Sequence, residues 1–158
     1  MTSIYLIGSL RNKRIPEIAN ELRAYGWEIF SDWYFASENA DDRWLEHEKG
    51  RGLTYAEALS APAAQHVFEF DKYHLDRCDM AILAMPAGKS GHIELGYMAK
   101  DKPTFVLFDE EPARWDVMYN FTCGVYFDIA SLIDGIKAEE LKKWPYTSVY
   151  EKRRKELS

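Results

Sequence analysis

The beginning of the chain alternates between strand-like and helix-like patterns, and this constrains the fold more than any other feature. Residues 4–7 are a short apolar, β-prone run that ends at Gly8, as a buried strand does. Apolar side chains then recur at helical spacing over 15–25, with a proline in the first turn and Gly26 as the stop signal. Residues 27–30 are again strand-like. A strand, a helix and a strand in this order predict a βαβ unit.

The same alternation continues along the chain. Residues 80–85 are continuously apolar, which is typical of a parallel strand covered on both faces. Residues 36–52 are polar, charged and punctuated by glycine, so we predict a long irregular segment there. Two more strands are predicted at 103–108 and 124–127. Helices are predicted at 53–60, at 62–77 and at 129–143, and a further helix follows the loop 86–91 and ends at Lys100. The pattern predicts one α/β domain over 1–145, doubly wound like flavodoxin or Rossmann domains, with five parallel strands, and a basic tail over 146–158.

Length and charge exclude several classes of protein. The chain has 158 residues, enough for one compact domain, and carries 20 Lys and Arg against 26 Asp and Glu. This acidic balance argues against binding to duplex nucleic acid, and we interpret the basic run 152–155 as a solvated end. No apolar run approaches the ~20 residues that cross a bilayer, and the start is not a signal peptide, so we expect a cytoplasmic protein with no membrane partner. Cys78 and Cys123 form neither a disulfide framework nor a CxxC motif.

Ligands of doubly wound folds bind at the carboxyl ends of the strands. This rule selects three polar segments, 8–14, 31–34 and 86–94. In the first, Gly8 allows close approach of a ligand, and Arg11 can bind an anion beside the N–H groups of the helix start. The segment contains neither a P-loop nor a GxGxxG motif. A phosphate or ribose contact and a plain turn with solvated basic side chains therefore both remain open.

Glu94 is the strongest candidate for a catalytic carboxylate. It falls in the first turn of a predicted helix, where the helix dipole favours the ionised form that a nucleophile needs. The flanking glycines, Gly88 and Gly91, allow a substrate to come close. The alternative is structural, because with Gly91 as the N-cap residue Glu94 becomes a capping glutamate.

Metal and serine chemistry fit this segment poorly. His92 and Glu94 resemble the HxE of zinc deaminases, but no PCxxC follows, and the four histidines lack the spacing of metal ligands. We therefore expect no metal and no cofactor. Ser90 and His92 lack the GxSxG elbow of a nucleophilic serine.

A second carboxylate, Asp71, lies among aromatic residues in the predicted helix 62–77. Such surroundings can raise the pKa of an acid and make it a proton donor. The alternative is a surface acid paired with Lys72 or Lys13. Asp79 stands at the start of a strand, where we expect it to fix a turn.

Three motifs in order resemble the nucleoside 2-deoxyribosyltransferase family, which includes the related 2′-deoxynucleoside 5′-monophosphate N-hydrolases. They are the YLIGSLR run from Tyr5 to Arg11, Asp71 followed eight positions later by Asp79, and the GHIELGY run from Gly91 to Tyr97. The similarity extends over about residues 3–135. It implies an α/β enzyme that cleaves the N-glycosidic bond of 2′-deoxynucleosides or their 5′-monophosphates.

The resemblance assigns roles to three catalytic residues. Glu94 attacks the anomeric carbon and forms a covalent deoxyribosyl-enzyme, which a free nucleobase or water then resolves. Asp71 helps to protonate the departing base, and Tyr5 contacts the nucleophile at the end of the first strand. Retaining glycosidases use two carboxyl groups in the same way, one as the nucleophile and one as the acid. The chain departs from the transferases at Gly88, where they carry an acidic residue.

The resemblance also implies how the substrate is bound. The loop of Gly8, Ser9 and Arg11 resembles the phosphate-binding loop of the monophosphate hydrolases, and Ser90 can join it. The family builds its pocket across a homodimer, which makes Asn120 a candidate contact to a neighbour's substrate and implies a homodimer or larger homo-oligomer.

The segment 36–52, with the nearby aromatics Trp33, Tyr34 and Trp44, is expected to cover the base. Two alternatives are a non-catalytic module that binds a nucleotide or ADP-ribose, and a glycohydrolase of NAD or ADP-ribose.

Overall fold

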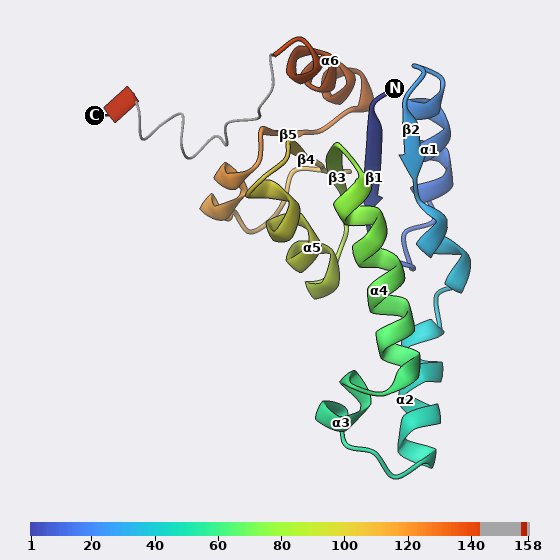
Figure 1. The fold of residues 1–158 in the computed structure, drawn as a ribbon. Helices are drawn as coiled ribbons and strands as arrows, with labels where there is room; N and C mark the ends of the chain where they lie inside the picture. Colours follow the sequence, from blue (N-terminus) through green and yellow to red (C-terminus); the bar gives the residue numbers. More distant parts are fainter. Residues whose placement is uncertain (143–155, 158) are drawn as a thin grey trace.

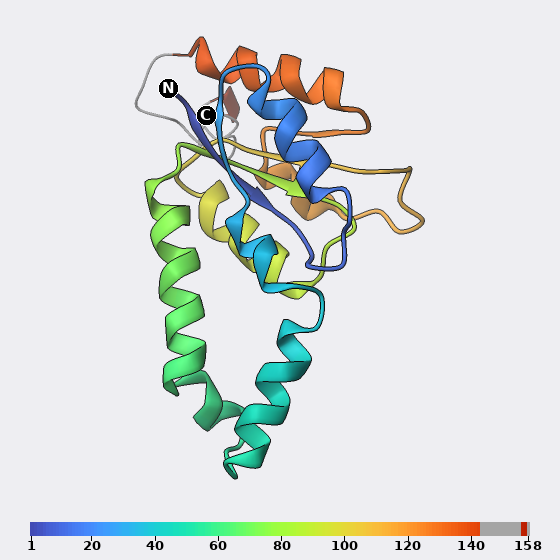
Figure 2. The ribbon, with the colours of Figure 1, turned by 90° about the vertical axis from the view of Figure 1, so that its right-hand side faces the viewer.

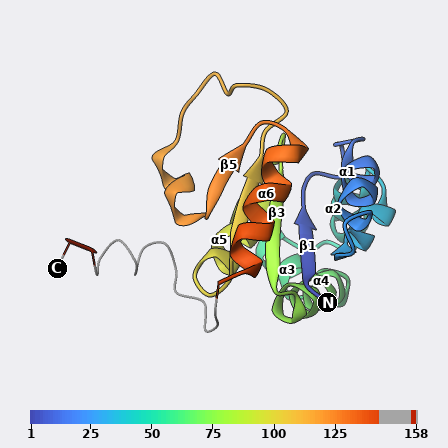
Figure 3. The same ribbon diagram turned by 90° about the horizontal axis from the view of Figure 1, so that it is seen from above.

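A computed structural model describes residues 1–142 and 156–157 of the chain. Within them the central feature is a five-stranded sheet in the order β2-β1-β3-β4-β5, and every neighbouring pair of strands is parallel. Figure 3 shows β5, β3 and β1 following one another across the molecule. The strands are β1 (Ser3–Ile7), β2 (Glu28–Phe30), β3 (Met80–Ala84), β4 (Thr104–Leu107) and β5 (Gly124–Tyr126). This topology confirms the predicted doubly wound α/β fold. The predicted domain boundary at 145, and the basic tail apart from residues 156–157, lie outside the described residues.

Helices cover both faces of the sheet. On one face, α1 (Ile15–Arg23) and α6 (Ile129–Glu140) pack against alternate strand residues such as Ile4 and Leu6. On the other face, α4 (Pro62–Arg77) and α5 (Lys89–Ala99) pack against the intervening residues, among them Tyr5. Side chains of a strand alternate between its two faces, so the direction of Tyr5 toward α4 and α5 follows from its place in β1.

The predicted irregular segment at 36–52 is wrong. After the short 3-10 helix η1 (Asp32–Ala36) the chain forms α2 (Ala40–Gly50), and α3 (Tyr55–Leu59) follows. Asp41 and Asp42 lie in the first turn of α2 and Lys49 in its last, so the charges complement the helix dipole. Within α2, Glu48 is buried and Trp44, one turn earlier, is half-buried.

The helix α2, the helix α3 and the first half of α4 form a projection that we call the helical arm (residues 40–70). Figures 1 and 2 show it extending past the carboxyl ends of the strands. No helix of the described residues is both long and apolar enough to cross a membrane.

Candidate functional site

Three ionisable side chains from distant parts of the chain meet on one face of the sheet. Tyr5 comes from the middle of β1, not from its end as the resemblance implies, and is 1% exposed. Asp71 comes from α4 and Glu94 from α5, the two helices that cover this face. Burial raises the pKa of the Tyr5 hydroxyl, and the nearby charges of Glu94 and Asp71 raise it further. The fold therefore brings the three candidate catalytic residues together.

The two carboxyl groups hold protons unusually strongly. Burial, followed by repulsion from Asp71, raises the pKa of Glu94 to about 8. Burial raises the pKa of Asp71 to about 6. Our expectation that the helix dipole keeps Glu94 ionised is therefore wrong. Because the two groups interact, these values describe a pair that holds one proton near neutral pH.

The start of α5 also differs from the prediction. The helix begins at Lys89 with Gly88 as its N-cap, three residues before the expected Gly91. Glu94 is thus in the second turn, and the alternative that it caps the helix is excluded. A Cβ at Gly91 would lie 3.1 Å from Leu83 Cδ1 and 3.3 Å from Ile7 Cγ2, so this buried glycine lets α5 approach the sheet closely. The close approach brings Glu94 toward β1.

Other acidic residues near the site have structural partners. Lys72 pairs with Asp76 at 2.8 Å, so it is not the partner of Asp71 that one alternative required. Asp79 accepts hydrogen bonds from the Ser3 backbone N–H at 2.9 Å and from the Ser3 hydroxyl at 3.0 Å. Asp79 therefore joins the start of β3 to the start of β1, a structural role like the one we expected for it.

The first loop lies at the carboxyl end of β1, beside an indole ring. A Cβ at Gly8 would come within 2.6 Å of Ile15 Cδ1 and 3.4 Å of Trp33, so a larger residue would not fit there without movement. Trp33 Nε1 donates a hydrogen bond to the Leu6 carbonyl at 2.8 Å, which holds the ring over the strand end. Arg11 is exposed beyond this point.

Asn12 is a residue that sequence reasoning missed. Its side chain is 7% exposed, and its Nδ2 donates to the Met85 carbonyl at 3.5 Å while its Oδ1 accepts from the Arg14 N–H at 3.0 Å. Asn12 thus joins the loop that carries Ser9 to the loop after β3. An asparagine in a short turn is a known signal for such side-chain to backbone bonds, but the partner is distant in sequence.

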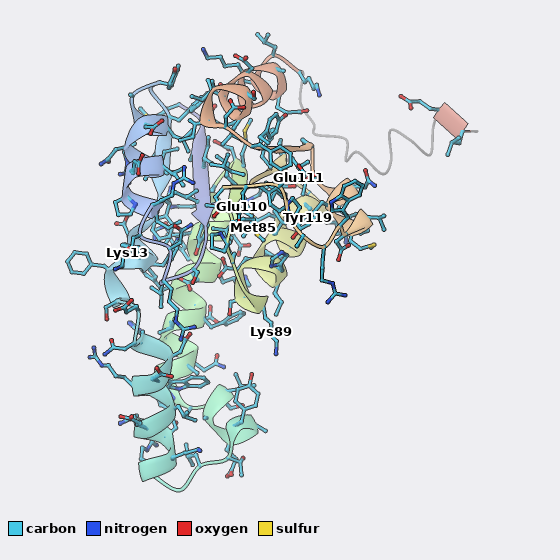
Figure 4. All side chains as sticks on the ribbon, turned by 180° about the vertical axis from the view of Figure 1, so that it is seen from behind. Lys13, Met85, Lys89, Glu110, Glu111 and Tyr119 are labelled. Atoms are coloured by element: carbon cyan, nitrogen blue, oxygen red, sulfur yellow. The ribbon has the colours of Figure 1, made fainter. Side chains whose placement is uncertain are left out.

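The loop after β3 continues into the exposed residues Gly88 and Ser90 at the start of α5. Figure 4 shows Lys89 at this end of the helix. Asn120 lies in the second 3-10 helix, η2 (Val117–Phe121), between β4 and β5. His92 and Tyr119 connect η2 to α5 by a hydrogen bond of 2.8 Å.

The aromatic residues expected over the base divide into two groups. Trp44 packs edge-on against Tyr55 at 6.3 Å, inside the helical arm. Trp33 and Tyr34 belong to η1 and meet edge-on at 5.9 Å. Trp33 lies beside Gly8 in the first loop, whereas Trp44 lies in the helical arm.

Among the described residues no group of three or more His, Cys, Asp or Glu side chains could hold a metal ion. The site is built from the tyrosine, the two carboxyl groups and the loops around them. Its chemistry is that of a proton-sharing acid pair with a carboxylate that can act as a nucleophile.

Comparison with known proteins shows the fold. No family model matches the chain, and no curated protein sequence matches it. The solved structure of a 2-deoxyribosyltransferase from Bacillus psychrosaccharolyticus is similar, with a TM-score of 0.56 and 15% identity over 83% of this chain and 90% of that one. A response regulator, TrrA from Thermotoga maritima, solved with Mg²⁺-BeF, has a TM-score of 0.51 and 21% identity over 87% of this chain and 98% of that one. At these identities the likeness concerns the architecture alone.

Proposed function

We propose that the protein cleaves the N-glycosidic bond of 2′-deoxynucleosides or their 5′-monophosphates, with Glu94 as the nucleophile. The observation that carries the proposal is the meeting of Glu94, Asp71 and Tyr5 in a desolvated cluster that raises the pKa of all three. Desolvation makes electrostatic stabilisation of a charged transition state stronger than it is in water. The architecture shared with a 2-deoxyribosyltransferase supports the same assignment.

The first step forms the C1′–O bond to Glu94 and breaks the C1′–N bond. The electron pair of the broken bond goes to the base, which takes a proton from Asp71 as it leaves. Positive charge that develops on the sugar is neutralised by the carboxylate of Glu94. The product is a free base and a deoxyribosyl ester of Glu94.

The second step reverses these roles. Water or another nucleobase attacks C1′, gives its proton to the Asp71 carboxylate and releases Glu94 as a carboxylate. The chemistry requires one proton on the pair at the start of each cycle, held by Asp71 while Glu94 is a carboxylate. The pKa values of about 6 for Asp71 and about 8 for Glu94 give the pair one proton near neutral pH but place it mainly on Glu94, so the proton must move from Glu94 to Asp71 before the attack. Tyr5 keeps its hydroxyl proton because burial raises its pKa, so it can donate to Glu94.

The loops at the strand ends are suited to the 5′ end of the substrate. Ser9 and Arg11 follow the end of β1, and Asn12 holds their loop to the Met85 carbonyl. Ser90, in the first turn of α5, is near the free N–H groups of a helix start, which favour an anion. We also include Gly8 and Gly88 as residues that keep backbone close to the substrate, whereas Gly91 faces the sheet and acts by letting α5 pack closely on it.

The proposal extends to a homodimer or larger homo-oligomer in which Asn120 reaches a neighbour's substrate. The support is the apolar surface around Asn120. The side chains of Trp115, Val117, Met118 and Phe121 are all exposed. Single exposed apolar residues are ordinary, but four in seven positions are typical of a surface that is covered by another chain.

The test is liquid chromatography of the protein incubated with the four deoxynucleosides, their 5′-monophosphates and NAD, with and without an added free base. Release of base from a deoxynucleoside or its monophosphate, abolished by Glu94→Gln, supports the proposal. A new nucleoside that appears only with the added base identifies transfer, and deoxyribose 5-phosphate identifies hydrolysis. Turnover of NAD alone, or of nothing, contradicts the proposal.

A further inference from the structure

The imidazole ring of His92 connects the start of α5, which follows the carboxyl end of β3, to η2, which precedes β5. Its Nδ1 lies 2.8 Å from the Gly88 carbonyl, and its Nε2 lies 2.8 Å from the Tyr119 hydroxyl. Gly88 is the N-cap of α5, and Tyr119 belongs to η2. His92 precedes Glu94 by two residues, so the two side chains leave α5 on nearly opposite sides.

The direction of both hydrogen bonds follows from the carbonyl. A carbonyl oxygen only accepts, so Nδ1 of His92 carries the hydrogen, and in the neutral ring Nε2 is then an acceptor. The Tyr119 hydroxyl therefore donates to Nε2. Burial, followed by the charge of Asp116, raises the pKa of Tyr119, which keeps this donor protonated.

Tyr119 in turn organises η2. Its ring packs edge-on against Phe108 at 5.6 Å. Its carbonyl accepts from the Thr122 hydroxyl at 2.7 Å and from the Thr122 N–H at 2.9 Å. Tyr119 therefore links the His92 ring to the backbone of η2, in which Asn120 is the next residue.

We propose that His92 and Tyr119 are positioning residues that fix the two segments receiving the 5′ end of the substrate. One segment is the loop that ends at Gly88 and Ser90, which serves the substrate of the same subunit, and the other is η2, whose Asn120 reaches the substrate of a neighbouring subunit. Neither His92 nor Tyr119 needs to touch the substrate. The inference rests on the proposed function, and it predicts that the pair matters for 5′-phosphorylated substrates rather than for bond cleavage.

The experiment measures binding in a background that cannot turn over. Glu94→Gln protein is titrated by calorimetry with the four deoxynucleosides and their 5′-monophosphates, with and without Tyr119→Phe. Loss of one hydrogen bond that positions a ligand group raises Kd by about two- to ten-fold. We expect this rise for the monophosphates and an unchanged Kd for the nucleosides. Tyr25→Phe, a matched change at an exposed tyrosine that stacks on Trp27, is the control.

A double-mutant cycle and a spectrum separate positioning from general loss of structure. His92→Asn retains a donor for the Gly88 carbonyl but cannot reach Tyr119, so combining it with Tyr119→Phe should add nothing further to Kd. Nitrogen-15 NMR of His92 should show the Nδ1–H tautomer. The Nε2–H tautomer, or equal weakening of nucleosides and monophosphates, overturns the inference. Because neither readout needs catalysis, a protein that binds monophosphates in this way but turns over no substrate refutes the proposed function alone.

Discussion

Replacing Glu94 by glutamine should make the protein more stable at high pH, and the structure gives the sign and the size. The pKa of Glu94 is raised from 4.5 to about 8 in the folded protein. Between these two values the unfolded chain ionises the group and the folded protein does not. The unfolded state then binds fewer protons, so the free energy of unfolding falls as pH rises from about 4.5 to about 8 and stays constant above that.

The magnitude follows from the width of this window. Within the window, each rise of one pH unit lowers the free energy of unfolding by about 1.4 kcal/mol. The three units from pH 5 to pH 8 therefore set an upper limit of about 4 kcal/mol on the loss of stability. Glu94 is half-buried rather than fully buried, so solvent screening reduces the expected loss of stability to about 2 kcal/mol. A glutamine cannot ionise, so Glu94→Gln removes this loss. Glutamine is also close in shape and hydrogen bonding to a protonated glutamate.

The assay is urea denaturation of wild type and Glu94→Gln at pH 5 and pH 8. We expect similar free energies of unfolding at pH 5 and a variant more stable by about 2 kcal/mol at pH 8. Glu21→Gln, at an exposed position of α1, controls for the loss of one charge. A stability difference between wild type and Glu94→Gln that does not change with pH refutes the reasoning, because Glu94 would then have no raised pKa.

Three further predictions concern the site. The kcat/KM of base release should rise near pH 6 and fall near pH 8, because the Asp71–Glu94 pair holds one proton between these values. A pH profile of kcat/KM that is flat from pH 5 to 9 would contradict the shared proton. Arg11→Ala should raise KM for monophosphates by about ten- to hundred-fold, the value of a charge-assisted hydrogen bond, while KM for unphosphorylated nucleosides changes little in the same assay. Gly91→Ala should lower the free energy of unfolding by about 1–3 kcal/mol in urea, since its Cβ would crowd Leu83 and Ile7, and an unchanged midpoint would show that α5 can move away freely.

The sheet was predictable because its strands are short apolar runs with clear stops. Residues 80–85 could be identified as a doubly covered strand without knowledge of any partner, and β3 occupies Met80–Ala84. Gly26 has a φ of 90° in the turn between the end of α1 at Arg23 and the start of β2, which explains why a glycine stands there. These signals are local, so a single sequence carries them.

The helical arm was not predictable, because its order depends on contacts between elements. The helix α2 has few apolar residues, and Trp44 finds its aromatic partner, Tyr55, only after the chain turns back. The helix α5 begins earlier than predicted for a similar reason. Gly88, Ser90 and Gly91 favour a loop by propensity, but packing of Gly91 on the sheet extends the helix through them.

The candidate site was predictable in its residues and not in its electrostatics. The sequence suggests Glu94 and Asp71 as carboxylates with chemistry, but their proximity depends on α4 and α5 lying on the same face of the sheet. Burial raises the pKa of both groups, and repulsion from Asp71 raises that of Glu94 further, against the local effect of the helix dipole. Asn12 and the His92–Tyr119 contact have partners distant in sequence, so they are seen only in the folded chain.

The central claim is that Glu94 becomes covalently attached to the sugar. The most direct test is mass spectrometry of protein mixed with a deoxynucleoside or its 5′-monophosphate and quenched within the first turnover. We predict a mass increase equal to the deoxyribosyl group or its 5-phosphate, on the peptide that contains Glu94, with one equivalent of base released. Release of base without an adduct, or an adduct on another residue, would contradict the account.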